Sequence, residues 1–148
     1  MENIRDLSEK LLQNSIENNL TLGRIILDSL LAVLPNESAE QCNVSNWLIT
    51  GFCFKVIASD GKISDKEVEY FNKLMNVDYS KDTITEKMSY FKNELDNLIQ
   101  TVSEYKDEIK NNFLTLAILF AVADGEVANE ELEILNKINQ GLGEEDGI

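Results

Sequence analysis

The chain has 148 residues, 43% of them hydrophobic, which suits one soluble domain with a real core. Its formal net charge of -14 argues against nucleic acid and anionic membranes as partners, because both bind clusters of Lys and Arg. No residue of the chain is a histidine, so His-based acid–base catalysis and His-bound zinc are excluded.

Hydrophobic periodicity predicts an all-α fold, with about seven helices in a single compact bundle. In chain order the expected helices cover residues 3–19, 20–34, 44–59, 64–76, 83–102, 104–123 and 129–140. The break in the first pair is placed at Asn18-Asn19, and Pro35 ends the second helix. Residues 1–142 are predicted to form one domain, and residues 143–148 an acidic, disordered tail.

Two of the predicted helices stand out because they are apolar on most sides. They cover residues 44–59 and the second half of 104–123, and the first is expected to lie at the centre of the bundle. Gly51 inside it is expected to mark a close helix–helix approach, and Gly141 is expected to be a helix C-cap. Both apolar runs are too short to cross a bilayer.

The cysteines and the N-terminal sequence indicate a reduced, cytoplasmic protein. Cys42 and Cys53 do not form a disulfide framework, and Cys53 lies inside an apolar run as a small buried hydrophobe would. Residues 1–6 lack the basic and apolar regions of a signal peptide. We therefore expect a cytoplasmic protein without a transmembrane segment.

The most informative feature is a stretch that occurs twice. Residues 58–67 read Ala-Ser-Asp-Gly-Lys-Ile-Ser-Asp-Lys-Glu, and 64 residues later 122–131 read Val-Ala-Asp-Gly-Glu-Val-Ala-Asn-Glu-Glu. Because Asp and Gly both favour turns, the pattern predicts a helix, an Asp-Gly turn and a second helix, used twice. The match extends to Lys73 and Lys137, each predicted to pair with the glutamate four residues before it.

The repeated string matches only the second half of a calcium-binding EF-hand loop. The first half of that loop would place Val56 and Ala58, or Phe120 and Val122, at ligand positions one and three. These side chains have no oxygen to offer, so an ordinary EF-hand is rejected. The turn and a pair of carboxylates at each copy remain.

Two interpretations of these carboxylates stay open. If the two helix–turn–helix units pack about a pseudo-twofold axis, Asp60, Glu67, Asp124 and Glu131 would lie together and bind a hard divalent cation such as Ca²⁺ or Mg²⁺. Alternatively, the aspartates are only turn residues and the glutamates only serve helix N-termini, Glu67 in a capping box with Ser64.

Paired Asp-Gly turns of this kind in an acidic helical chain resemble the TerB-like domain of tellurite-resistance proteins, best over residues 44–140. The resemblance implies an all-α domain with two pseudo-symmetric halves, and a divalent metal held by Asp60, Glu67, Asp124 and Glu131. It also implies a link to tellurite and other stress responses or to membrane-associated complexes. Ala128 departs from the Ser or Thr helix cap common in the family, which leaves the expected cap to Asn129.

The sequence predicts a non-enzymatic module that binds a divalent cation or a protein partner through its acidic turns. It contains no Gly-rich phosphate loop, no nucleophile with a base and no inward Glu-x-x-His pattern. The alternative is an acidic immunity or inhibitor protein that covers a basic toxin, because residues 124–148 carry eight carboxylates against the single Lys137. In both cases the expected partner is a protein, basic in the second case.

Overall fold

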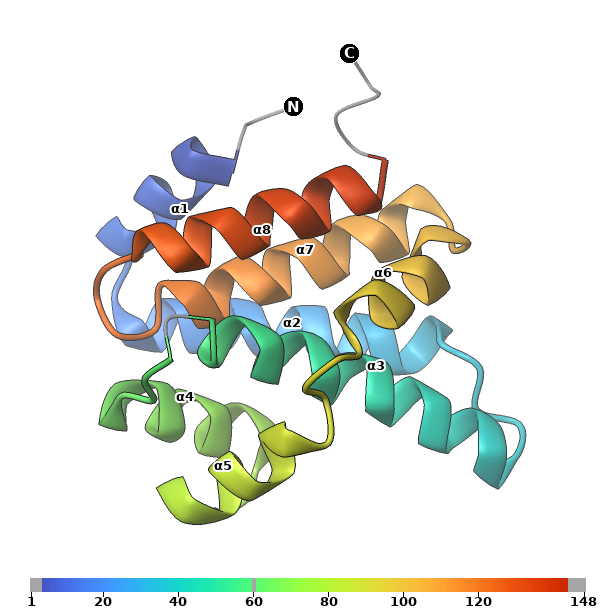
Figure 1. Cartoon of the computed structure of the whole chain (residues 1–148). Helices are drawn as coiled ribbons and strands as arrows, with labels where there is room; N and C mark the ends of the chain where they lie inside the picture. The colour runs from blue at the N-terminus through green and yellow to red at the C-terminus, as the bar shows by residue number, and fades with distance from the viewer. Residues whose placement is uncertain (1–3, 60, 144–148) are drawn as a thin grey trace.

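The computed structural model describes residues 4–59 and 61–143, and these residues form eight helices and no strand (Figure 1). The helices are α1 (Ile4–Gln13), α2 (Ile16–Val33), α3 (Ala39–Ile57), α4 (Asp65–Met75), α5 (Lys81–Ser89), α6 (Leu95–Ser103), α7 (Asp107–Ala121) and α8 (Asn129–Gly141). The predicted all-α class is confirmed, with one helix more than expected. Of the predicted tail, residues 144–148 lie outside the described residues.

Helices α3 and α7 form the centre of the fold, and from Leu48 and Phe113 onward they are buried on most sides, as their apolar runs predict. They pack against each other, with the rings of Phe52 and Phe113 5.3 Å apart between centroids. Helix α2 lies along α7, α1 packs on α7 and α8, and α6 contacts α3 and α8. Buried side chains from all eight helices join one hydrophobic cluster.

Each central helix is followed by a helix after an Asp-Gly turn (Figure 1): α8 packs back along α7, whereas α4, which follows α3, packs mainly on α2. In Figure 1 both central helices end on the left, so both Asp-Gly turns lie at the same end of the bundle. Helix α5 packs against α3 and α4 beyond the first turn. No helix in the described residues is both long enough and apolar enough to cross a membrane.

Serine caps place several helix starts away from their predicted positions. The break before α2 lies at Asn14-Ser15, where Ser15 Oγ accepts from the Asn18 N–H at 3.0 Å. Asn19 is buried within α2 and its side chain donates to the Leu11 carbonyl at 2.8 Å, so the break predicted at Asn18-Asn19 is wrong. Helix α3 likewise starts earlier than predicted, behind Ser38.

The helix predicted over residues 83–102 is two helices. Helix α5 starts behind the Ser80 cap and ends at Ser89, and α6 begins at Leu95. Short turns connect them: the Phe91 N–H donates to the Met88 carbonyl, and the Glu94 N–H donates to the Phe91 carbonyl. These turns keep a spacing of about three residues, so the apolar periodicity runs through a place where the helix stops.

Two glycines allow helices to approach closely. A Cβ at Gly51 would lie 2.8 Å from Leu98 Cδ2 and 2.9 Å from Phe91 Cε1, which confirms the predicted close approach. The prediction that Gly141 is the C-cap of α8 is wrong, because Gly141 is the last residue of the helix and Leu142 is the cap. A Cβ at Gly141 would overlap the γ2 methyl of Ile99, so this glycine is needed for α8 to pack on α6.

Candidate functional site

The first Asp-Gly turn connects α3 to α4. Ala58 caps the end of α3, and its carbonyl accepts from the Gly61 N–H at 3.0 Å. Gly61 has a φ of 76°, which residues other than glycine rarely adopt. Ser64 then caps α4 in the predicted capping box. Its Oγ accepts from the Glu67 N–H at 3.0 Å, and Glu67 Oε1 accepts from the Ser64 N–H at 2.9 Å. Asp60 lies outside the described residues.

The second turn repeats the backbone hydrogen bonds, the positive-φ glycine and the glutamate contact of the first, 64 residues later. The Gly125 N–H donates to the Val122 carbonyl at 3.0 Å, and Gly125 has a φ of 95°. Glu131 Oε1 accepts from the Ala128 N–H at 2.9 Å, as Glu67 does at Ser64. The half-buried Asp124 closes the turn, because its Oδ1 accepts from the Glu126 N–H at 3.3 Å.

The two turns differ at the helix cap. The N-cap of α8 is Ala128, and Asn129 is the first residue of the helix, so the cap predicted at Asn129 is wrong. Alanine has no hydroxyl to accept from the Glu131 N–H, so only the glutamate half of the capping box exists here. The cap of α8 thus has one of the two side-chain hydrogen bonds that the cap of α4 has.

Both glutamates of the motif are buried, although they lie next to exposed turns. Glu67 and Glu131 are each 1% exposed, and their Oε2 atoms are buried as well. Burying a carboxylate is costly unless its oxygens are compensated, and each Oε1 is compensated by the cap amide. An ordinary solvent-facing capping box does not require this depth of burial.

A surface hollow of about 420 Å³ joins the two halves next to the turns. Ala58 and Ser59 line it from the end of α3, and Glu130 and Glu133 from the first turns of α8. The residues that precede Asp60 therefore face the helix that carries Glu131. Among the described residues, however, no three His, Cys, Asp or Glu side chains are grouped so that they would hold a metal ion.

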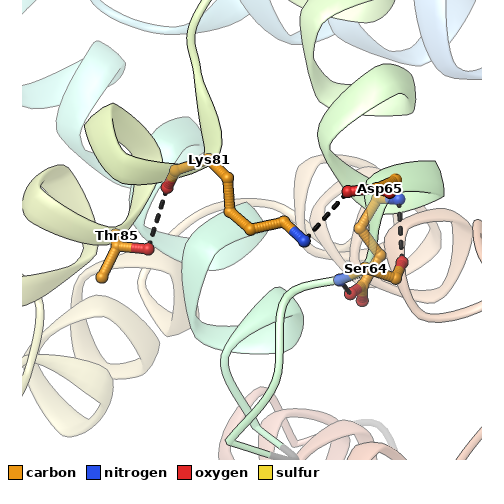
Figure 2. Close-up of polar contacts among 5 residues, drawn as sticks. Ser64, Asp65, Lys81 and Thr85 are labelled. Carbon is orange, nitrogen blue, oxygen red and sulfur yellow. Dashed lines mark hydrogen bonds and ion pairs between the residues drawn. The ribbon is translucent and has the colours of Figure 1, made fainter.

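Lysines near the turns are paired differently in the two halves. Lys73 pairs with Glu69 at 2.7 Å as predicted, but Lys137 pairs with Asp96 of α6 at 3.5 Å and not with Glu133. Lys137 also lines the hollow between the halves, which the repeat pattern did not indicate. On the first side, Lys81 at the start of α5 contacts Asp65 at 2.9 Å, so α5 is tied to the first turn of α4 (Figure 2).

The cysteines do not supply a nucleophile near the turns. Cys53 is fully buried in α3, as predicted, and burial raises the pKa of its thiol far above the ordinary value. A thiol held protonated in this way is inert at neutral pH. Cys42 is partly exposed near the start of α3, and its thiol lies 3.7 Å from the Asn36 carbonyl.

Comparison with known protein families shows to which family the chain belongs. The family model of the tellurite resistance protein TerB matches residues 48–146. The chain belongs to the TerB family. The match begins in the middle of α3 and takes in both Asp-Gly turns, so TerB membership covers both copies of the repeated motif. Searches of curated proteins and of solved structures found no significant match.

Proposed function

We propose that this TerB protein is a non-enzymatic helical module that binds a divalent cation at its paired Asp-Gly turns and acts as a protein-interaction scaffold. The process we associate with it is tellurite resistance or a related stress response in the cytoplasm. The cation would stiffen the two turns and so fix the surface that this end of the bundle presents to a partner protein.

The observation that carries the proposal is the duplication of the turn down to its backbone hydrogen bonds and its buried glutamate. Both copies use the same backbone bonds, the same positive-φ glycine and the same buried glutamate, at one end of the bundle. A turn needs no buried carboxylate to reverse the chain, so the repeated burial of Glu67 and Glu131 favours a shared role beyond capping.

The donor atoms suit a hard cation. Asp60, Glu67, Asp124 and Glu131 offer only carboxylate oxygens, which Ca²⁺ and Mg²⁺ prefer to nitrogen or sulfur. The Oε1 atom of each glutamate accepts from the backbone N–H of the helix cap at 2.9 Å. In this arrangement the cap orients the ligand, as hydrogen bonds to metal-binding carboxylates commonly do.

Calorimetric titration with Ca²⁺, Mg²⁺ and Mn²⁺ tests the cation. We expect heat and a rise in melting temperature with at least one of them, and loss of both in an Asp60→Asn/Asp124→Asn variant. An Asp28→Asn/Asp78→Asn variant is the matched control, because it removes the same charge from exposed positions outside the motif. Absence of heat and of any thermal shift with all three ions would remove the cation from the proposal.

A second candidate function is an acidic inhibitor that covers a basic toxin. The observation that favours it is the concentration of eight carboxylates against one lysine in residues 124–148. Such a protein needs an acidic surface but no symmetric site. Co-purification from the native cell distinguishes the two, because a single basic partner released by salt, together with no cation response, would support the inhibitor.

A further inference from the structure

An apolar stripe runs along the outer flank of α2. Ile25 and Val33 are 58% and 56% exposed, although the neighbouring Ile26 and Leu30 are buried in the core. Ile25, Ser29 and Val33 follow one another at intervals of four residues, so they lie on one face of the helix. Two aliphatic side chains on one face of α2 are therefore exposed to solvent.

The stripe borders a concave surface. A hollow of about 380 Å³ lies beside α2, with Ser29 and Val33 on one wall. Tyr105 from the connection between α6 and α7 and Ile109 from the first turn of α7 line the same hollow. A groove with aliphatic and aromatic walls beside an apolar stripe suits the apolar face of an amphipathic helix.

The groove is acidic, and one of its carboxylates lies where a negative charge is unfavourable. Glu104 and Glu108 line it together with Lys106. Glu104 is the C-cap of α6, where the helix dipole favours a cation, and the last turn of α6 has no basic residue to compensate it. Partial burial and the negative charge of Glu104 both raise the pKa of Tyr105. The Glu104 charge is therefore felt by a side chain that lines the groove.

From these features we infer that the groove of α2 and α7 binds a cationic amphipathic helix of a partner protein. The apolar face of that helix would cover Ile25 and Val33, and its Lys or Arg side chains would meet Glu104 and Glu108. A second copy of the chain fits less well, because a symmetric dimer would oppose the same acidic groove in two molecules of charge -14.

The groove is separate from the Asp-Gly turns. It lies at the N-terminal end of α7, whereas the second turn follows the C-terminal end. A helix of 15 residues spans roughly 22 Å. The inference rests on the interaction role proposed above but not on cation binding, so the two can fail independently.

The test uses the full ¹⁵N-labelled chain and an amphipathic peptide of about five helical turns, with leucine on one face and lysine on the other. We expect the peptide to change the amide chemical shifts of residues 25–33 and 104–112. These changes should be the same in the presence of Ca²⁺ and in the presence of EDTA. A peptide of the same composition in shuffled order, and one with glutamate for lysine, should bind far more weakly. Changes confined to the Asp-Gly turns, or equal binding of the three peptides, would overturn the inference.

Variants of the stripe supply the second arm. Ile25→Ser/Val33→Ser should weaken peptide binding by roughly tenfold or more, because the apolar surface of these two side chains is no longer available to be buried by the peptide. Leu31→Ser is the matched control, since Leu31 is 44% exposed but points about 200° away from Ser29 around α2. Unchanged binding by the double variant would overturn the inference, as would a wild-type dimer in light scattering that the double variant abolishes.

Discussion

Replacing Ala128 with serine should complete the half-made cap of α8. The backbone is already suited to it, because Ala128 has φ -70° and ψ 158° while Ser64 has φ -83° and ψ 156°. Ser64 Oγ accepts from the Glu67 N–H at 3.0 Å, and a serine at 128 would accept from the Glu131 N–H in the same way. A Ser cap in place of alanine stabilises a helix by about 1 kcal/mol.

The free energy of one cap can be converted into a change in melting temperature, and the repeat supplies the reverse substitution. For a chain of this length, about 1 kcal/mol raises the melting temperature by roughly 2–4 °C, so Ala128→Ser should gain that much. Ser64→Ala should lose a similar amount, because it removes the equivalent bond from the first turn. The two caps belong to different helices, so a double variant should be close to the wild type.

Urea unfolding followed by circular dichroism measures these differences, with Asn129→Ala as the control. Asn129 is the first residue within α8 and not its cap, so its loss should change the free energy of unfolding by less than about 0.5 kcal/mol. The reasoning is refuted if Ala128→Ser gains nothing while Ser64→Ala costs stability. It is also refuted if Asn129→Ala costs as much as a lost cap.

Other predictions concern the carboxylates, the close helix contact and the buried thiol. Glu67→Gln/Glu131→Gln keeps an acceptor for each cap but removes the charge; it should lose a Ca²⁺-dependent stabilisation of about 2.7 kcal/mol at about 100 times the Kd, and an unchanged Ca²⁺ response in urea unfolding would leave the glutamates as caps only. Gly141→Ala should cost about 1–3 kcal/mol of unfolding free energy, and Ile99→Leu, which lacks the overlapping methyl, should recover part of it; no cost in thermal unfolding would contradict the packing argument. Burial raises the pKa of Cys53, so only the unfolded thiol ionises above about pH 8.5; stability should fall as pH rises past that point, and Cys53→Val should fall less steeply in urea unfolding between about pH 7.5 and pH 10.

The central helices were predictable because burial leaves a direct mark on composition. Helix α7 is apolar from Phe113 to Ala121 and every residue there except Thr115 is buried, so the pattern has one reading. Helix starts were harder, because several polar residues compete for each cap and only the folded chain selects one. Ser80 caps α5 although Thr83 and Glu86 also form a capping-box pattern.

The candidate site was predictable in its local parts and not in its tertiary ones. The turn, the glycine φ and the Ser64–Glu67 cap depend on neighbouring residues, so the sequence contains them. The pairing of Lys137 with Asp96 depends on how α8 packs against α6, which the repeat does not encode. The same is true of any shared cation site, because it requires the two hairpins to pack with their acids converging.

The position of α2 bears on how this protein can be handled in the laboratory. The TerB match starts at residue 48, inside α3, but α2 lies along α7, and Tyr70 of α4 donates to the Asn19 carbonyl of α2 at 2.8 Å. A recombinant fragment trimmed to residues 48–146 would begin halfway through a central helix and uncover the side of α7 that α2 shields. Such a fragment is expected to aggregate, so expression should retain the residues before position 48.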